Sequence, residues 1–222
     1  MGNKSALIIG ATGLVGNELT QRILSSDDYS QINIISRSKT TFDDYRITET
    51  NDDFENLSQH PEQFNVDDVF CCIGTTMKKA GSKEKFVRID YHYPMEIARL
   101  SLKEPSVKNF LIVTAVGANP DSSIFYNQVK GELERDLQKL DFKSLHIFRP
   151  SLLLGDRNEF RIWESVAKAF SAFLSFFLIG SEKKIWAIQS EKVAEAMHNV
   201  AREGKQGTYF YEPAKIRSLT KS

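Results

Sequence analysis

Residues 6–16 read ALIIGATGLVG, in which a short apolar run leads directly into three glycines, Gly10, Gly13 and Gly16. An apolar segment with helical spacing follows, so the stretch predicts a strand, a tight turn and a helix. Three features of such a unit favour a residue without a Cβ: the turn itself, the approach of a pyrophosphate to the backbone, and the contact between helix and strand. We therefore expect a dinucleotide phosphate site at the start of this helix, whose N–H groups and positive dipole end attract anions. The expected contacts are Gly10, Thr12, Gly13, Leu14, Val15 and Gly16.

Apolar runs of strand length alternate with segments of helical period along the rest of the first two thirds of the chain. The expected strands are residues 6–10, 32–36, a weaker 45–48, 68–74, 109–114 and 144–150, and the expected helices are residues 14–25, 84–103 and 123–140. Such alternation is typical of βαβ units on a parallel sheet. It predicts an α/β protein with a doubly wound parallel sheet, the Rossmann fold, in strand order 3-2-1-4-5-6.

The chain has 222 residues, enough for one well-filled α/β domain. We expect a single NAD(P)-binding domain over residues 1–222, with a core at about 5–150 and a short helical C-terminal cap and tail at about 151–222. Within this tail we expect helices at Trp163–Ile179 and Glu191–Arg202 and a short strand at Gly207–Tyr211. The cap is expected to cover the carboxyl edge of the sheet, with Phe170–Phe177 closing over the apolar side of a pocket.

Composition excludes several classes of protein. The 29 basic residues balance the 29 acidic ones, so the sequence predicts no nucleic-acid or acidic-membrane partner. The uncharged apolar run Ala169–Ile179 is too short to span a bilayer. Cys71 and Cys72 are adjacent and would face opposite sides of a strand, which favours a reducing, cytoplasmic location over secretion. The histidines lack metal-site spacing, so no metal is expected; they are His60, His92, His146 and His198.

The end of the second strand reads IISRSK, and it bears on the choice between the two nicotinamide dinucleotides. A free ribose 2′-hydroxyl requires an acidic acceptor at this point, whereas a 2′-phosphate requires a cation. Arg37 and Lys39 are available here, and no acid occurs before Asp43. We therefore expect Ser36 and Arg37 to contact the cofactor and NADP(H) to be preferred. The alternative is that Arg37 is only a solvated residue after a strand.

Two further strand ends are expected to reach the cofactor. Asp53 and Phe54 follow the weak third strand, where related folds contact the adenine ring, although a single acid in TNDDFEN is also typical of plain surface. Gly74 and Thr75 follow the fourth strand, at the crevice where the strand order reverses. Ligands of doubly wound sheets bind in that crevice, so both residues are expected to line the cofactor site.

The segment SSIFYNQVKGELE, Ser122 to Glu134, places Tyr126 and Lys130 four residues apart at the start of a predicted helix. Residues with this spacing lie on one helix face with their side chains in reach of each other. A tyrosine that gives a proton to a carbonyl has a reference pKa of about 10, and a nearby ammonium favours its phenolate. The position of the pair after the fifth strand favours a catalytic role, in which Lys130 also holds the nicotinamide ribose. The alternative is an ordinary helix surface.

Several segments in the same order resemble a known family. The glycine turn is similar to that of the extended and atypical short-chain dehydrogenase/reductases. The segments CCIGTTMKKAG, KFVRIDYHYPMEIA, SSIFYNQVKGELE and FRPSLLLGDR together resemble the Tat-interacting-protein-like oxidoreductases, which are atypical members that bind NADPH. The resemblance covers most of the chain, and its most specific parts are CCxGTT, YxxxKGE and RPxxLL.

This resemblance implies roles for further residues. The family carries a serine at the end of the fifth strand that binds the substrate carbonyl, and Thr114, 12 residues before Tyr126, takes that place here. Ser122 and Ser123 are alternatives that read more simply as helix N-caps. Arg149, Pro150 and Ser151 follow the sixth strand, where the backbone of related enzymes passes the nicotinamide, so Pro150 is an expected cofactor contact. Lys79 and Asp90 match the family pattern without a role that the sequence explains.

The preferred interpretation is an NADPH-dependent oxidoreductase that reduces a carbonyl or a related small molecule with an apolar part. In it Tyr126 supplies the proton, Lys130 lowers the pKa of Tyr126, and Thr114 orients the substrate oxygen. A second interpretation is a non-catalytic NADP(H)-binding regulator or redox sensor that acts through a protein partner. A sugar-nucleotide epimerase is disfavoured because the tail after Pro150 is short for a sugar-nucleotide domain. The sequence leaves open whether the protein is a monomer or a homodimer.

Overall fold

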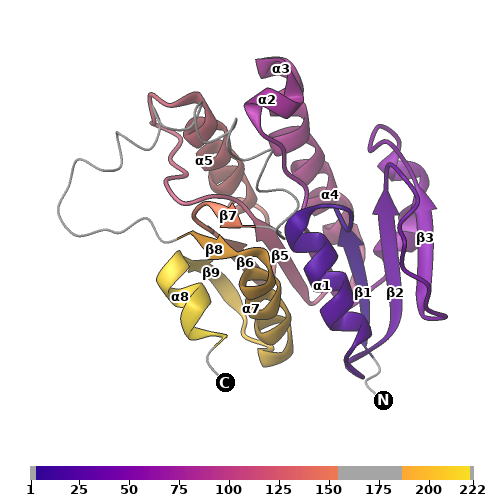
Figure 1. Cartoon of the computed structure of the whole chain (residues 1–222). Helices are drawn as coiled ribbons and strands as arrows, with labels where there is room; N and C mark the ends of the chain where they lie inside the picture. The colour runs from indigo at the N-terminus through magenta and orange to yellow at the C-terminus, as the bar shows by residue number, and fades with distance from the viewer. Residues whose placement is uncertain (1–3, 155–186, 221–222) are drawn as a thin grey trace.

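A computed structural model describes residues 4–154 and 187–220, and its centre is a parallel sheet (Figure 1). The strands are β1 (Lys4–Ile9), β2 (Tyr29–Ser36), β3 (Ile47–Asn51), β4 (Asp68–Cys71), β5 (Asn109–Val113), β6 (Ser144–Phe148) and β9 (Gly207–Tyr211). Their order is β3-β2-β1-β4-β5-β6-β9, and every neighbouring pair is parallel. The predicted Rossmann order 3-2-1-4-5-6 is therefore confirmed, and a seventh strand extends it.

Helices follow the strands as βαβ connections require. They are α1 (Leu14–Leu24), α2 (Met77–Ala80), α3 (Lys83–Val87), a π-helical turn η3 (Arg88–His92), α4 (Tyr93–Lys103), α5 (Phe125–Leu137), α7 (Ser190–Glu203) and α8 (Pro213–Ser218). Two 3-10 turns, η1 (Leu57–Gln59) and η2 (Pro61–Phe64), connect β3 to β4. Two further strands, β7 (Leu153–Leu154) and β8 (Ile188–Gln189), form a separate short parallel sheet. Among the described residues, no helix is long and apolar enough to cross a bilayer.

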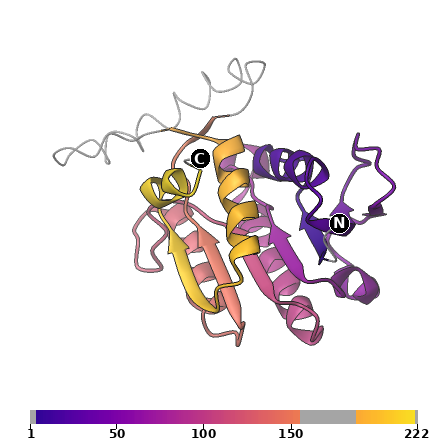
Figure 2. The same cartoon turned by 90° about the horizontal axis from the view of Figure 1, so that it is seen from below.

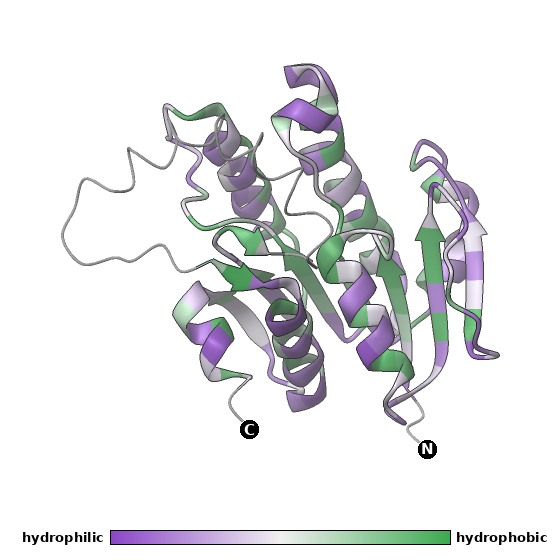
Figure 3. Ribbon diagram, in the orientation of Figure 1, coloured by the Kyte–Doolittle hydropathy of each residue, from purple (hydrophilic) through white to green (hydrophobic). Residues whose placement is uncertain are grey.

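Both faces of the sheet are buried along the inner strands, which explains why β1, β4, β5 and β6 read as largely apolar runs, whereas the edge strands β3 and β9 are mostly exposed or half-buried. Along β1, Ala6 and Ile8 belong to a core with α1 and α7, whereas Leu7 and Ile9 belong to a second core with α4 and α5. This division follows from the alternation of side chains along a strand. Figure 2 shows the sheet between the two helical layers, and Figure 3 shows the apolar strands inside polar outer helix faces.

Several element boundaries differ from the sequence prediction by a few residues, and two of these differences have a local cause or an unpredicted turn. The third strand begins at Ile47 rather than at residue 45, because Arg46 is held in the preceding turn by Asp44. The single helix expected over residues 84–103 is interrupted by the π turn at Arg88–His92. A π turn adds a residue to the helical ladder without breaking the apolar face, so the 3.6-residue period gives no warning of it.

The tail also differs from the prediction of a helical cap over residues 151–222. In the described part, β9 pairs with β6 and α7 packs on α1, so this segment completes the sheet and one helical layer. The expected helix Glu191–Arg202 and the expected strand Gly207–Tyr211 both form, as α7 and β9. The expected helix Trp163–Ile179 and its Phe170–Phe177 segment lie outside the described residues.

A buried polar cluster occupies the amino edge of the sheet, where the strands begin. The carboxylate of Asp68, the first residue of β4, accepts a hydrogen bond from Tyr29 Oη at 2.7 Å. Lys4 Nζ lies 2.6 Å from the same carboxylate, and Asn109 Nδ2 donates to it at 2.6 Å. We call Lys4, Tyr29, Asp68 and Asn109 the amino-edge cluster. Its carboxylate is fully buried with its hydrogen bonds satisfied, as a buried charge requires.

Candidate functional site

The glycine turn after β1 has the geometry that a phosphate-binding turn needs. Gly10 has φ 92°, and a Cβ there would lie 2.7 Å from the carbonyl of Cys72. A Cβ at Gly16 would lie 2.1 Å from the carbonyl oxygen of Gly10, so α1 sits directly on the turn. Gly13 donates to the Gly10 carbonyl at 2.9 Å and precedes the first residue of α1. Gly10 and Gly16 therefore cannot carry side chains without moving the backbone.

The other predicted residues of the turn differ in what they expose. Thr12 and Gly13 are exposed, and Leu14 is partly exposed at the start of α1. Val15 is buried in the core shared with α7. Thr12, Gly13 and Leu14 can thus meet a ligand, whereas Val15 can offer only its backbone.

The loop after β2 presents an unpaired cation. Arg37 and Lys39 are exposed, and among the described residues neither has an ion-pair partner. Ser36 is buried, and its hydroxyl donates to the Ser38 carbonyl at 2.7 Å. The guanidinium of Arg37 is therefore available to an anion at the carboxyl end of β2.

Sequence reasoning missed an acid beside this loop, Glu49 of β3. The register of β3 on β2 brings Glu49 beside the loop, where Thr40 donates to its carboxylate from both N (2.7 Å) and Oγ1 (3.1 Å). Ser36 Oγ lies 3.2 Å from the same carboxylate. These donors occupy the carboxylate, so it is a poor acceptor for a ribose hydroxyl. Only the strand register, which the weak β3 pattern did not define, would have revealed it.

After β3, the loop is shaped by Asp52 rather than by Asp53. The Asp52 carboxylate accepts from Phe54 N at 2.5 Å and contacts His60 Nε2 at 3.1 Å. Asp53 is exposed and accepts from Glu55 N at 3.1 Å. Phe54 is buried with φ 72°, and its ring centroid lies 5.6 Å from that of Tyr93. Asp53 is thus open to solvent at the expected adenine position, whereas the buried Phe54 side chain packs against Tyr93 and anchors the loop.

A buried ion pair lies at the carboxyl end of β4. Lys130 Nζ and Asp90 Oδ1 are 2.7 Å apart, and their side chains are 3% and 0% exposed. Asp90 Oδ2 also accepts from Thr75 N at 3.0 Å. Gly74 is exposed beside the pair, and a Cβ on it would lie 3.6 Å from Asp90 Oδ1. The structure therefore brings together Gly74, Thr75 and Lys130, which were predicted separately, and adds Asp90 to them.

Tyr126 stands one helical turn before Lys130 on α5 and is partly exposed. Its ring centroid lies 5.5 Å from that of Phe86 of α3. Burial raises the pKa of Tyr126 above its ordinary value; Lys130 acts in the lowering direction and Asp90 in the raising direction. The expected downward effect of Lys130 on the pKa of Tyr126 exists, but burial outweighs it, and the Asp90 carboxylate adds a smaller upward effect. Tyr126 is accordingly a protonated phenol at neutral pH.

Lys130 itself keeps its charge. Burial lowers the pKa of Lys130, but Asp90 and Tyr126 raise it, and the net direction is upward. A buried ammonium is stable when an opposite charge lies this close. The site therefore holds an ammonium next to a phenol, with a carboxylate behind the ammonium.

Thr114, the predicted substrate-orienting hydroxyl, is engaged elsewhere. Its Oγ1 donates to Glu134 Oε1 of α5 at 2.5 Å. Glu134 also binds Arg149, whose Nε lies 3.1 Å from each carboxylate oxygen, and Arg149 in turn pairs with Glu212. The hydroxyl proton of Thr114 is thus directed at Glu134, which ties α5 to β5 and to the end of β6.

The remaining sequence predictions have local structural roles. Ser122 accepts from Ile124 N at 3.1 Å, and α5 is capped at Ile124 without a side-chain bond, so neither Ser122 nor Ser123 is the predicted N-cap. Pro150 is buried after β6, and its carbonyl accepts from Val116 N at 3.0 Å. Among residues 4–154 and 187–220, no group of three His, Cys, Asp or Glu side chains is arranged to hold a metal ion.

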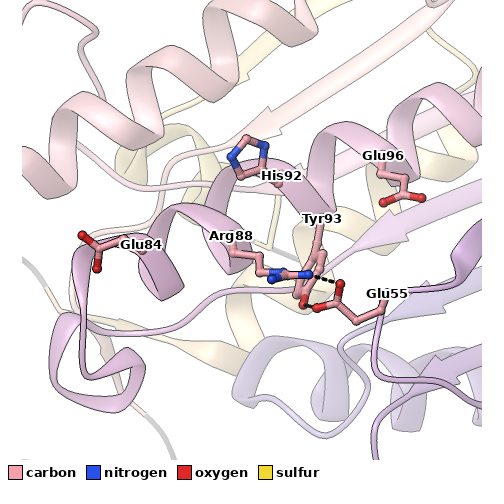
Figure 4. A pocket seen from close by; sticks show the side chains of 6 residues that line it. All are labelled: Glu55, Glu84, Arg88, His92, Tyr93 and Glu96. Carbon is pink, nitrogen blue, oxygen red and sulfur yellow. Dashed lines mark hydrogen bonds and ion pairs between the residues drawn. The ribbon is translucent and has the colours of Figure 1, made fainter.

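An open groove of about 390 Å³ lies on the other side of the helical segment that bears Asp90. Its lining residues are Glu55, Glu84, Arg88, His92, Tyr93 and Glu96 (Figure 4). Figure 4 shows Arg88 and Tyr93 turned toward Glu55, with which both interact. These contacts fasten the loop after β3 to the π turn. None of the six is a predicted cofactor or catalytic residue.

With this geometry in view, comparisons with known proteins identify the family. A family model described as HIM1 matches residues 25–181, more than half of the chain. The chain belongs to the HIM1 family. The HIM1 match begins after the glycine turn and includes β4, η3, α5 and β6, which carry the Asp90, Tyr126 and Lys130 site.

Curated relatives agree with this HIM1 assignment. Protein HTATIP2 of Rattus norvegicus is 41% identical over 174 residues, which are 77% of this chain and 71% of that protein. Protein FMP52, mitochondrial, of Saccharomyces cerevisiae is 33% identical over 156 residues, 69% of this chain and 67% of that protein. The predicted resemblance to Tat-interacting-protein-like oxidoreductases is confirmed. The cytoplasmic location stays a prediction, because the fungal relatives are named as mitochondrial.

Solved structures share the fold of this HIM1-family chain. An oxidoreductase of the short-chain dehydrogenase/reductase family from Burkholderia thailandensis has a TM-score of 0.68 at 14% identity and covers 98% of this chain and 94% of its own. The Bordetella bronchiseptica enzyme WbmF in complex with NAD⁺ has a TM-score of 0.69 at 13% identity and covers 99% and 78%. At such identities the likeness concerns the Rossmann fold alone.

Proposed function

We propose that this protein is an NADPH-dependent oxidoreductase that reduces a carbonyl or a related small molecule with an apolar part. The observation that carries the proposal is the pair of Tyr126 and Lys130 on α5, with the buried ammonium next to Gly74 and Thr75 at the end of β4. That strand end neighbours the glycine turn, where doubly wound sheets bind dinucleotides. A proton donor and a cofactor site thus meet at one edge.

The residues around the turn fit a bound NADPH. Gly10 and Gly16 leave no room for side chains, and the first N–H groups of α1 would hold a pyrophosphate. Arg37 would hold the 2′-phosphate, Asp53 would meet the adenine, and Gly74, Thr75 and Pro150 would flank the nicotinamide half. When bound, NADPH supplies the hydride for the reduction.

The protein's own part in the reaction is proton transfer and positioning. Tyr126 Oη donates its proton to the substrate oxygen as negative charge develops there. Its raised pKa keeps the phenol protonated at neutral pH, which suits a donor better than a base. Lys130 would hold the ribose hydroxyls and stabilise the phenolate that remains. The apolar side chains around Tyr126, which include Met77, Phe86 and Phe125, favour a substrate with an apolar part.

A panel of aldehydes, ketones and quinones, monitored by NADPH absorbance, tests the proposal. We expect turnover of at least one class and its loss in Tyr126→Phe, with the NADPH dissociation constant unchanged. Phe125→Tyr is a useful companion, because it adds a phenol one residue away and should not restore turnover in the Tyr126→Phe background. Undiminished turnover in Tyr126→Phe would exclude this residue as the donor.

A non-catalytic NADP(H)-binding regulator is the second candidate, and one observation favours it. The Thr114 hydroxyl donates to Glu134, and the next residue is Ala115, so the serine position offers no hydroxyl proton to a substrate. The regulator predicts tight NADPH binding without turnover on any substrate of the panel. In an active enzyme, Thr114→Val would lower stability through Glu134 but leave kcat within about threefold, since the hydroxyl does not donate to the substrate.

A further inference from the structure

We propose that Asp90 is a positioning residue for the reduction: its carboxylate fixes the Lys130 ammonium at the end of β4, one helical turn from Tyr126. The inference rests on the proposed function of Tyr126 as the donor. It adds a residue from a different helical segment to the Tyr126 and Lys130 pair.

The geometry supports a fixed position for the ammonium. Lys130 Nζ is 2.7 Å from Asp90 Oδ1, both side chains are buried, and Asp90 Oδ2 accepts from Thr75 N at 3.0 Å. The carboxylate is thereby held from two sides, by a helix and by a strand end. A lysine side chain has several rotatable bonds, and such a partner selects one of its conformations.

The helical position of Asp90 explains how the carboxylate reaches this place. Asp90 is the middle residue of Arg88–His92, and Arg88 and His92, two residues away on either side, line the outer groove on the opposite helix face. The turn is π-helical, and such turns occur frequently at functional sites. Here Arg88, His92 and Glu96 face outward while Asp90 faces the buried lysine.

One side of the pair remains open to a ligand. Gly74 is exposed, and a Cβ on it would lie 4.0 Å from Lys130 Nζ and 3.6 Å from Asp90 Oδ1. A side chain at position 74 would therefore stand between solvent and the ion pair. With glycine there, ribose hydroxyls can approach the ammonium over the backbone of β4's end.

Lys130 and Asp90 are described residues whose charges act on Tyr126. Lys130 lies on the same helix and Asp90 on the π turn, and the Cys71 thiol of β4 interacts electrostatically with Lys130. Burial raises the pKa of Cys71 to about 12, so this thiol is neutral over the working range. Within the described part of the chain, Lys130 lowers the pKa of Tyr126 and Asp90 raises it, so their effects oppose each other. Removal of the anion alone would unbalance them.

The variant Asp90→Asn removes the negative charge and keeps an oxygen that can accept from Thr75 N. Two results follow for Lys130, and both act in the same direction. If the ammonium stays charged, its uncompensated pull lowers the pKa of Tyr126. If burial now makes it lose its proton, activity falls with that titration. In either case, the alkaline limb of the kcat/KM profile for carbonyl reduction should move to lower pH by about one unit or more.

Asp68→Asn is the matched control. Asp68 is also fully buried, also paired with a lysine and also close to a tyrosine, but it lies at the amino edge of the sheet. We expect both variants to lower the unfolding midpoint and only Asp90→Asn to move the alkaline limb. An unmoved limb in an active Asp90→Asn enzyme, or an equal shift in Asp68→Asn, would overturn the inference.

The test also separates this inference from the proposed function. If no carbonyl is turned over, two titrations remain: the phenolate absorbance of Tyr126, isolated by subtracting the spectrum of Tyr126→Phe, and the ¹⁵N resonance of the Lys130 ammonium, assigned by its loss in Lys130→Met. Asp90→Asn should move at least one of these to lower pH, whatever the substrate. If neither moves, Asp90 has only a structural role, even if reduction by NADPH is established.

Discussion

The two edges of the sheet carry the same three side-chain types in different arrangements. At the amino edge, Asp68 binds Lys4 and the hydroxyl of Tyr29. At the carboxyl edge, Asp90 binds Lys130, and Tyr126 stands one helical turn away. Both carboxylates are fully buried and both ammonium groups lie within 2.7 Å of them. Residue identity alone therefore does not distinguish a structural cluster from a candidate active site.

The difference lies in how completely each tyrosine is enclosed. Tyr29 is 1% exposed, and burial followed by the neighbouring Asp68 raises its pKa far above the ordinary value. Tyr126 is partly exposed, its carboxylate neighbour is bound to Lys130 and to the Thr75 amide, and an exposed glycine lies alongside. A closed arrangement stabilises the fold, whereas an arrangement with one open side can meet a substrate. This comparison predicts opposite consequences for equivalent substitutions.

The largest expected effect concerns the two tyrosines. Tyr126→Phe should lower kcat by about 10²- to 10⁴-fold, the usual contribution of a general acid, with little change in unfolding free energy. Tyr29→Phe should do the reverse: activity per folded molecule is kept, and stability falls by about 1–3 kcal/mol because Asp68 loses a buried donor. Urea unfolding and steady-state rates on both variants check this. Equal losses of activity would break the distinction between the two edges.

A smaller effect, on the pH dependence of stability, is expected from His146 of β6, which is fully buried like Tyr29. Ser144 Oγ donates to the Lys205 carbonyl, so it accepts from His146 Nε2, and His146 Nδ1 accepts from Tyr211. Burial lowers the pKa of His146 to about 4, against 6.5 in the unfolded chain. The unfolded state binds the proton first, so stability is lost as pH falls from 6.5 toward 4, by up to about 3 kcal/mol.

Urea midpoints measured across this pH range test the role of His146. The variant His146→Gln cannot take up the proton, so its stability should fall less steeply between pH 6.5 and 4 than that of the natural protein. Parallel curves for the two proteins would show that the histidine is not held neutral. Activity per folded molecule should be the same in both, since His146 lies away from the open edge.

The smallest expected effect concerns the cation after β2. Arg37→Gln should weaken NADPH binding by about tenfold and leave NADH binding unchanged, because a charge-assisted hydrogen bond to the 2′-phosphate is lost. Lys108→Gln is the control: it removes an exposed lysine that pairs with Asp67 near the amino edge. Dissociation constants for both dinucleotides check the pair of variants. Tighter NADH than NADPH binding in the natural protein would remove Arg37 from this role.

The fold was largely predictable because burial on both sheet faces leaves a strong pattern. The strands near 6–10, 32–36, 68–74, 109–114 and 144–150 are runs of apolar residues, and local burial explains each of them. The π turn at Arg88–His92 and the place of β9 were not predictable in the same way. The π turn lies within a continuous helical segment, so the sequence predicts one helix there. The place of β9 depends on which edge of the sheet remains unpaired after the first six strands have assembled.

The candidate site was predicted in parts but not as an assembly. The spacing of Tyr126 and Lys130 within one helix is visible in sequence, and so is the glycine turn. Asp90 lies 40 residues before Lys130, so only the packing of η3 on α5 reveals their ion pair. The Glu134 carboxylate that takes the Thr114 proton was likewise hidden, since no local pattern states which side chains meet across α5 and β5.

The packing of α7 on α1 has a consequence for biosynthesis. Leu19 and Ile23 of α1 bury their side chains in the same core as Val193 and Val200 of α7, which are synthesised more than 160 residues later. An isolated helix of 11 residues is marginal in water, so α1 gains part of its stability when α7 has left the ribosome and docked. The phosphate turn at the N-terminus therefore becomes firm late, through contacts of high sequence separation that slow folding. Nascent chains that end before α7 should expose the apolar face of α1 to chaperones.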